Sequence, residues 1–154
     1  MKKIIFSLML VFGSLSIQAQ ELTWYDNVKK ATEVAAKEKK PLMLFFTGSD
    51  WCGWCIRLQK EVFVTPEFAK WAKQNVVLVE LDYPRRKQLS PEITNQNNQL
   101  QQMFAVQGYP TVWFVKSVVV KEKIEFQQIG STGYVAGGPE SWIGTANEIL
   151  KTKK

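Results

Sequence analysis

The feature that most limits what this chain can fold into and do is its pair of cysteines. Cys52 and Cys55 are the only two in 154 residues, they are separated by two residues, and the chain contains no histidine. Without histidine there is no Cys-His protease, no serine triad and no histidine-rich metal site. Two thiolates alone do not complete a tetrahedral zinc site. We therefore predict no metal, no bound cofactor, and a chemistry that belongs to the cysteine pair.

The cysteines lie in Trp51-Cys52-Gly53-Trp54-Cys55, between two segments of clear periodicity. The continuous apolar run at residues 41–46 predicts a short strand buried on both faces. Residues 47–50 interrupt it, and the apolar residues after Cys55 are spaced as on a helix with one buried face. The pair is therefore expected to open a helix directly after a strand.

A helix N-terminus offers unpaired backbone N–H groups and the positive end of the helix dipole, which lower the pKa of a thiol. Cys52, nearer solvent, is the predicted nucleophile, and Cys55, about one turn on and better buried, the predicted resolving cysteine. A purely structural disulfide is the alternative. It would close so short a loop that it would remove little unfolded-state entropy.

The segment from Phe46 to Cys55 resembles the active-site segment of the thioredoxin superfamily, and is most similar to small exported bacterial thioredoxin-like domains related to the C-terminal domain of DsbD. The resemblance covers roughly residues 24–150. It implies an α/β thioredoxin-like fold, a central mixed β-sheet flanked by helices on both faces. It also implies a thiol-disulfide oxidoreductase.

The second motif of the resemblance is Gly108-Tyr109-Pro110-Thr111, directly before an apolar run. The resemblance implies a cis Tyr109-Pro110 bond and a loop facing the cysteines, where the backbone of Tyr109 pairs with an extended substrate. The predicted substrate-binding residues are therefore Tyr109, Pro110 and Thr111. Trp54 is added to them because exposed aromatic side chains often mark binding surfaces, and an exposed aromatic without such a role is the alternative.

Other residues near the pair are assigned supporting roles: Trp51 as a packing residue and Gly53 as part of the motif. The position where many thioredoxins keep a buried acid falls at Phe46. Another group must then take the proton from Cys55, and Asp50 and Glu80 are both candidates. Each is more often an ordinary solvated or hydrogen-bonded carboxylate.

The first residues differ from the rest: Lys2 and Lys3 precede an apolar stretch too short to span a bilayer, followed by small residues up to Ala19. We predict a cleaved signal peptide at residues 1–19, a thioredoxin-like domain at residues 20–154, and a periplasmic or secreted location in a Gram-negative bacterium. An uncleaved anchor is the alternative. The net charge of +6 is scattered, so neither nucleic acid nor stable membrane insertion is expected.

The remaining elements follow from their patterns. Helices are predicted at residues 24–39, 66–74 and 139–150 and in a segment starting at Ser90. A buried strand is predicted at residues 76–81, and an antiparallel hairpin is predicted from residues 112–120 and 124–129. The polar stretch at residues 83–102 is longer than in minimal thioredoxins and starts as a surface excursion.

Three functions are compatible with these residues. The first is an oxidoreductase that reduces or exchanges disulfides of exported proteins, kept reduced by a membrane electron donor of the DsbD type, because the periplasm would otherwise oxidise it. The second is a disulfide-donating oxidase, and the third a binding module without essential redox activity. A monomer suffices for the chemistry.

Overall fold

The computed structural model describes residues 21–121 and 123–152. The leader predicted at residues 1–19 lies outside this part. Eleven elements follow one another in the described residues: β1 (Trp24–Tyr25), α1 (Val28–Glu38), β2 (Leu42–Thr47), α2 (Gly53–Leu58), the π-helical turn η1 (Gln59–Phe63), α3 (Pro66–Asn75), β3 (Val77–Asp82), α4 (Pro91–Met103), β4 (Thr111–Val120), β5 (Lys123–Thr132) and α5 (Gly138–Lys151).

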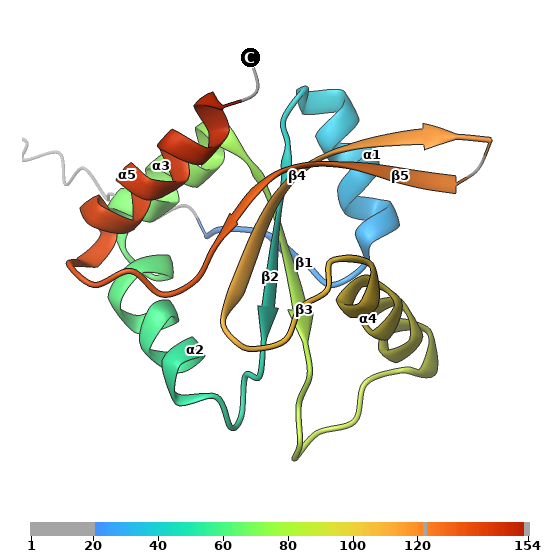
Figure 1. The fold of residues 1–154 in the computed structure, drawn as a ribbon, viewed down its shortest axis with the longest axis horizontal. Coiled ribbons are helices and arrows are strands. Elements are labelled where there is room, and N and C mark those ends of the chain that lie inside the picture. Colours follow the sequence, from blue (N-terminus) through green and yellow to red (C-terminus); the bar gives the residue numbers. More distant parts are fainter. Residues whose placement is uncertain (1–20, 122, 153–154) are drawn as a thin grey trace, which may run out of the picture.

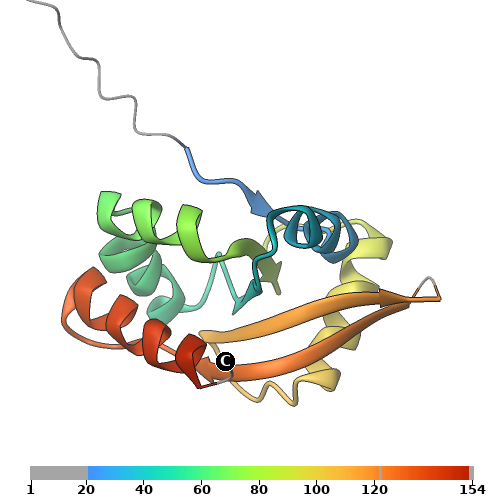
Figure 2. The same cartoon turned by 90° about the horizontal axis from the view of Figure 1, so that it is seen from above.

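The strands form one mixed sheet in the order β1-β3-β2-β4-β5. β2 pairs in parallel with β3 and antiparallel with β4, which places it at the centre of the sheet. All six of its residues are buried, as its continuous apolar run predicts. β4 and β5 make the predicted hairpin, which extends beyond the other strands (Figures 1 and 2).

Helices cover both faces of this sheet, so the predicted α/β architecture is confirmed (Figure 1). On one face, α2, η1, α3 and α5 pack on Met43, Phe45 and Phe114. On the other face, α1 and α4 pack on Leu44, Phe46 and neighbouring strand residues. Since side chains alternate along β2, each face receives every second residue.

One boundary is wrong in the sequence-based prediction. The helix expected at residues 24–39 begins only at Val28, because the side chain of Asn27 accepts a hydrogen bond from the Lys30 N–H and caps the helix there. Trp24 belongs instead to β1, which pairs in parallel with β3, and its ring packs among Phe45, Phe63 and Phe68. A two-residue strand has too few positions to show a period of two.

The other boundaries agree with the sequence to within about two residues, except the end of β5, which was predicted at residue 129 and lies at Thr132. Thr65 caps α3 and Ser90 caps α4, and each is followed by proline at the first helical position. The segment after the cysteines is less regular than expected, since α2 changes into the π-helical turn η1 before α3 begins. α3 is a separate helix rather than a smooth continuation of α2. No helix in the described residues is both apolar enough and long enough to cross a membrane.

Candidate functional site

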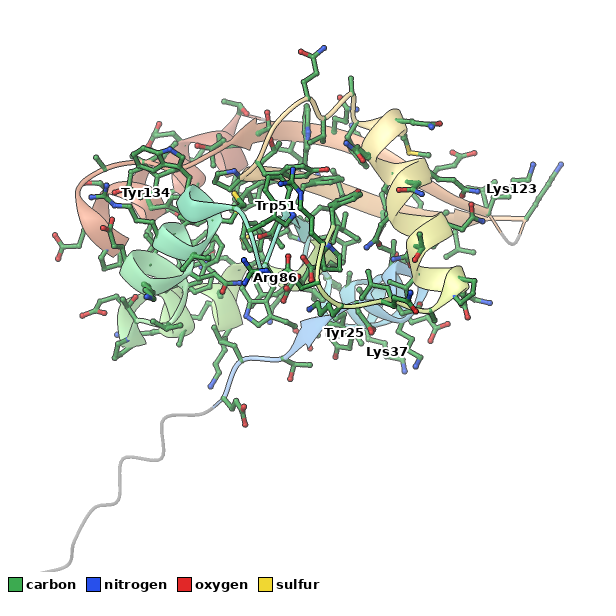
Figure 3. All side chains as sticks on the ribbon, turned by 90° about the horizontal axis from the view of Figure 1, so that it is seen from below. Tyr25, Lys37, Trp51, Arg86, Lys123 and Tyr134 are labelled. Atoms are coloured by element: carbon green, nitrogen blue, oxygen red, sulfur yellow. A yellow bond between two sulfur atoms is a disulfide. The ribbon has the colours of Figure 1, made fainter. Side chains whose placement is uncertain are left out.

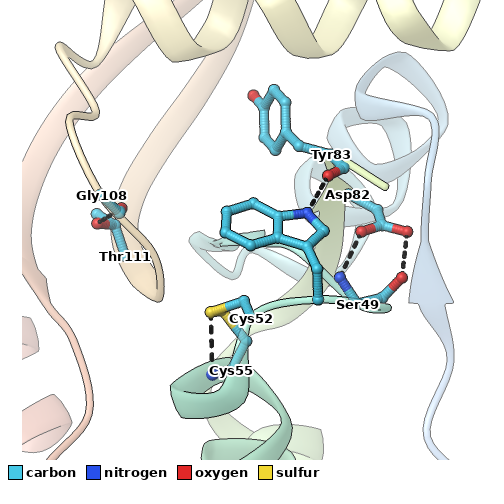
Figure 4. Close-up of a disulfide and its surroundings, with 8 residues drawn as sticks. Ser49, Cys52, Cys55, Asp82, Tyr83, Gly108 and Thr111 are labelled. Carbon is cyan, nitrogen blue, oxygen red and sulfur yellow. Dashed lines mark hydrogen bonds between the residues drawn. A yellow bond between two sulfur atoms is a disulfide. The ribbon is translucent and has the colours of Figure 1, made fainter. Parts of the chain in front are cut away.

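The cysteine pair lies at the connection between β2 and α2, with Cys52 directly before α2 and Cys55 in its first turn. Beyond Thr47 the chain turns back, and the backbone N–H groups of Trp51 and Cys52 both donate to the Gly48 carbonyl, at 3.2 and 2.8 Å. Cys52 is the N-cap of α2, and its Sγ accepts a hydrogen bond of 3.2 Å from the Cys55 N–H (Figure 4). The helix start predicted from the sequence is confirmed.

Cys52 and Cys55 form a disulfide with their Cα atoms 5.2 Å apart. Cys52 is 6% exposed and Cys55 only 1%, so an external thiol or disulfide reaches Cys52 first. The helix N-terminus and the Cys55 N–H are placed to stabilise a negative charge on the Sγ of Cys52. The geometry thus suits attack through Cys52 and resolution through Cys55.

Trp51 forms one side of the site. Its indole N–H donates to the Tyr83 carbonyl at 2.7 Å (Figure 4), and its ring meets Tyr109 edge to face, with centroids 5.7 Å apart. The ring packs so closely on Gly48 that a Cβ there would lie 2.4 Å from it. The guanidinium of Arg85 lies over the Trp51 ring, 3.8 Å from the ring centroid. The packing role expected for Trp51 agrees with these contacts.

Trp54 forms the opposite side and is 55% exposed. Its ring lies 5.1 Å from Tyr134, and the guanidinium of Arg57 lies 5.3 Å from each of the two rings. Arg57 pairs with Glu61 at 2.7 Å, and Glu61 also accepts a hydrogen bond from the Tyr134 hydroxyl. These bonds lower the pKa of Glu61, the bond from Tyr134 having the larger effect. Figure 3 shows Tyr134 on the far side of the site from Arg86.

The loop at residues 108–111 faces the disulfide (Figure 4), and the Tyr109-Pro110 bond is cis, as predicted. The Thr111 hydroxyl donates to the Gly108 carbonyl at 2.8 Å, which tightens the turn before β4. The Tyr109 ring also lies against the Tyr83 ring, with their centroids 5.2 Å apart. Gly133 approaches from the segment after β5, where a Cβ would lie 3.1 Å from the Pro110 carbonyl. Tyr109, Pro110 and Thr111 are therefore at the site, while their contact with substrate stays a prediction.

The two carboxylates suggested as proton acceptors differ. Asp50 accepts hydrogen bonds from the backbone N–H groups of Arg85 and Arg86, and the first of these chiefly lowers the pKa of Asp50, which makes it a weak base. Glu80 lies on β3, on the same sheet face as Asp82, and is half-buried. Desolvation, with Asp82 as a smaller cause, raises its pKa.

Asp82, which the sequence favours less than Asp50 or Glu80 as a proton acceptor, lies close to the cysteine turn. It is buried, and its carboxylate accepts hydrogen bonds from the Ser49 N–H at 2.9 Å and the Ser49 hydroxyl at 2.7 Å, while Lys87 pairs with it at 2.7 Å (Figure 4). These bonds tie the turn before Cys52 to the end of β3. The contacts of Asp82 with Ser49 and of Tyr134 with Glu61 carry no local sequence signal, because each joins residues more than 30 positions apart. Within the described residues no cluster of three or more acids or cysteines could hold a metal ion.

Comparison with known proteins agrees with this geometry. The thioredoxin-like family model matches residues 23–117, well over half of the chain. The chain belongs to the thioredoxin-like family. The disulfide bond reductase DsbH of Chlamydia pneumoniae is 31% identical over 137 residues, which cover 89% of this chain and 78% of DsbH. The thioredoxin-related protein DsbJ of the same organism is 28% identical over 88% of this chain, which spans only 39% of DsbJ.

Solved structures lead to the same family. A DsbH oxidoreductase superposes with a TM-score of 0.78 at 29% identity, covering 96% of both chains. The reduced DsbD C-terminal domain of Neisseria meningitidis has a TM-score of 0.52 at 22% identity and covers 79% of this chain and 92% of that domain, a likeness of fold. With its Cys52-Cys55 disulfide in this family, the chain is a thiol-disulfide oxidoreductase that exchanges with thiol and disulfide partners.

Proposed function

We propose that this thioredoxin-like protein is exported and works as a reductase of disulfides in other exported proteins. The observation that carries the proposal is the disulfide at the N-cap of α2, in a chain similar over most of its length to a disulfide bond reductase. Residues 1–19 act as a cleaved leader to the periplasm, and residues 20–154 form the working domain, a monomer. A membrane electron donor of the DsbD type returns the protein to its reduced state.

The reaction follows from the positions of the sulfurs. The Cys52 thiolate attacks one sulfur of the substrate disulfide, a mixed disulfide forms, and the other substrate sulfur leaves as a thiolate that takes up a proton. Cys55, deprotonated, then attacks Cys52, which releases the second substrate thiolate. Two electrons pass to the substrate, and Cys52-Cys55 is left as the disulfide seen here. During attack the substrate lies against Trp54 and the loop of Tyr109, Pro110 and Thr111, pairing with the Tyr109 backbone.

The first test is the reduction potential of the Cys52-Cys55 pair, measured by equilibration in thiol buffers with tryptophan fluorescence as the readout. A reductase predicts a value near or below about −230 mV, whereas a value of about −120 to −180 mV would indicate a disulfide-donating oxidase or an isomerase. A Cys55→Ser variant is expected to trap substrates as mixed disulfides on Cys52, and Cys52→Ser to trap none. If Cys52→Ser kept full biological activity, a binding module would replace the redox function.

We further propose that Glu80, rather than Asp50, accepts the proton from Cys55. Support comes first from position, because Glu80 pairs with Phe45 across the two central strands, and Phe45 lies in the same core cluster as Cys55. The pKa directions agree, since a carboxyl with a raised pKa is a better base near neutral pH than one whose pKa is lowered. Glu80→Gln should slow release of the mixed disulfide about 10- to 100-fold at pH 7, an effect that shrinks as rising pH deprotonates Cys55 directly. Asp50→Asn is the matched control and should keep the wild-type pH profile. Equal slowing in both variants would exclude this role for Glu80.

A further inference from the structure

We propose that Arg85 and Arg86, named here the basic lip, form a docking site beside the disulfide for an acidic segment of the protein that is reduced. The inference rests on the proposed function and deepens it, since it specifies the chemistry of the substrate. It also gives a role to the beginning of the polar stretch after β3.

The basic lip is held at the active site by its backbone. The Asp50 carboxylate accepts hydrogen bonds from the N–H of Arg85 at 3.0 Å and from that of Arg86 at 2.7 Å. The preceding carbonyl, that of Tyr83, accepts the Trp51 indole N–H at 2.7 Å. Asp50 and Trp51 immediately precede Cys52 in the chain, so any movement of the lip relative to the disulfide would break these bonds.

The side chains of the basic lip are exposed to solvent. In the part of the chain that the structure describes, neither Arg85 nor Arg86 forms an ion pair. Two other cations near the site differ, since Lys87 pairs with Asp82 and Arg57 pairs with Glu61. The lip therefore carries positive charge that no ion pair neutralises.

The nearby acids offset only part of that charge, because the Asp50 carboxylate interacts electrostatically with Arg86 but forms no ion pair with it. The Asp50 carboxylate is turned to the lip's own backbone, and Asp82 is buried against Ser49 and Lys87. Arg85 lies 3.8 Å from the centroid of the Trp51 ring, which spreads the guanidinium over an aromatic face and leaves its N–H groups at the edge to bind a carboxylate. Paired guanidinium groups next to a reactive sulfur suit Asp or Glu side chains that flank a substrate cysteine.

The test uses the pre-reduced protein as the only reductant, in single turnover. Three peptides share one intramolecular disulfide and differ in its flanks, which are acidic, neutral or basic. Cys52 and Cys55 supply two electrons and become the disulfide, and each peptide becomes a dithiol. The variant Arg85→Gln/Arg86→Gln removes two charges from the lip, and Arg86→Gln alone leaves the contact of Arg85 with Trp51 intact. The control Lys37→Gln/Lys123→Gln removes two exposed charges that lie away from Trp51 (Figure 3).

We expect the wild type to reduce the acidic peptide about tenfold faster than the basic one at low salt, and this ratio to fall as salt is added. In the double lip variant the rate of reduction should fall about 3- to 10-fold for the acidic peptide and stay the same for the other two peptides. Arg86→Gln should lower the rate for the acidic peptide by a smaller factor, and the control variant should not change it. All variants should keep the wild-type reduction potential. Equal losses in lip and control variants, or an unchanged preference without the lip, would overturn the inference. Failure to reduce the neutral peptide would instead overturn the proposed reductase function itself.

Discussion

The two tryptophans on either side of the disulfide contact the same kinds of side chain but differ in how firmly they are held and how exposed they are. Each lies beside one tyrosine ring and below one arginine. Trp51 is further fixed by a hydrogen bond to the Tyr83 backbone and by close packing on Gly48, whereas Trp54 is 55% exposed and rests on side chains. The comparison indicates that Trp51 belongs to the framework that positions Cys52, and that Trp54 belongs to the surface a partner meets.

The largest effect is expected when each tryptophan ring is removed in turn. Trp51→Ala should lower the free energy of unfolding by about 2–4 kcal/mol, because it leaves a cavity at Tyr109 and an unpaired Tyr83 carbonyl. Trp54→Ala should change it by less than about 0.5 kcal/mol and mainly slow the reduction of protein substrates. Urea unfolding followed by far-UV circular dichroism measures both. Similar losses in the two variants would contradict the distinction between framework and surface.

A second pair of variants adds one methyl group on each side. Gly48→Ala places a Cβ 2.4 Å from the Trp51 ring, which is held by its hydrogen bond, and should lower the free energy of unfolding by about 1–3 kcal/mol. Gly53→Ala is the matched control, since no atom lies within 4 Å of its Cβ position and it opens α2. That variant should be unchanged or more stable by up to about 1 kcal/mol. A stable Gly48→Ala protein would show that Trp51 moves freely.

The smallest effect is expected on the Trp54 side, from Tyr134→Phe. The variant loses the hydrogen bond that chiefly lowers the pKa of Glu61 from its ordinary value of 4.5. A lowered carboxyl pKa stabilises the fold above pH 4.5 and this contribution is lost as the pH falls through the folded pKa. The wild type should thus unfold at slightly higher temperature than Tyr134→Phe at pH 7, with the gap closing towards pH 3.

Tyr25→Phe, on β1, is the control for that series and should follow the wild type at every pH in thermal unfolding. If the gap between Tyr134→Phe and the wild type were the same at pH 3 and pH 7, the Glu61 carboxylate would not be the group responsible. Trp54 fluorescence in the same samples reports whether its ring keeps its place beside position 134.

Much of the fold was predictable because it depends on short stretches of chain. The buried strand at Leu42–Thr47 shows as a continuous apolar run, and the start of α4 shows as Ser90 followed by proline. The failure at Trp24 has a physical cause. That residue pairs with β3, more than 50 positions away, and a local apolar spacing that also fits a helix does not distinguish the two.

For the site, the sequence by itself determined the cysteine pair and the helix start at Cys52, because spacing and residue type fix these within a few positions, while the loop of Pro110 was predicted from the resemblance to the thioredoxin superfamily. The tertiary structure alone decided what surrounds them: Tyr134 beside Trp54, Asp82 beneath Ser49, and Arg85 over Trp51. Each of these contacts joins segments that only the sheet order brings together. Hydrogen bonds and ring contacts depend on distance in space, which sequence periodicity does not encode.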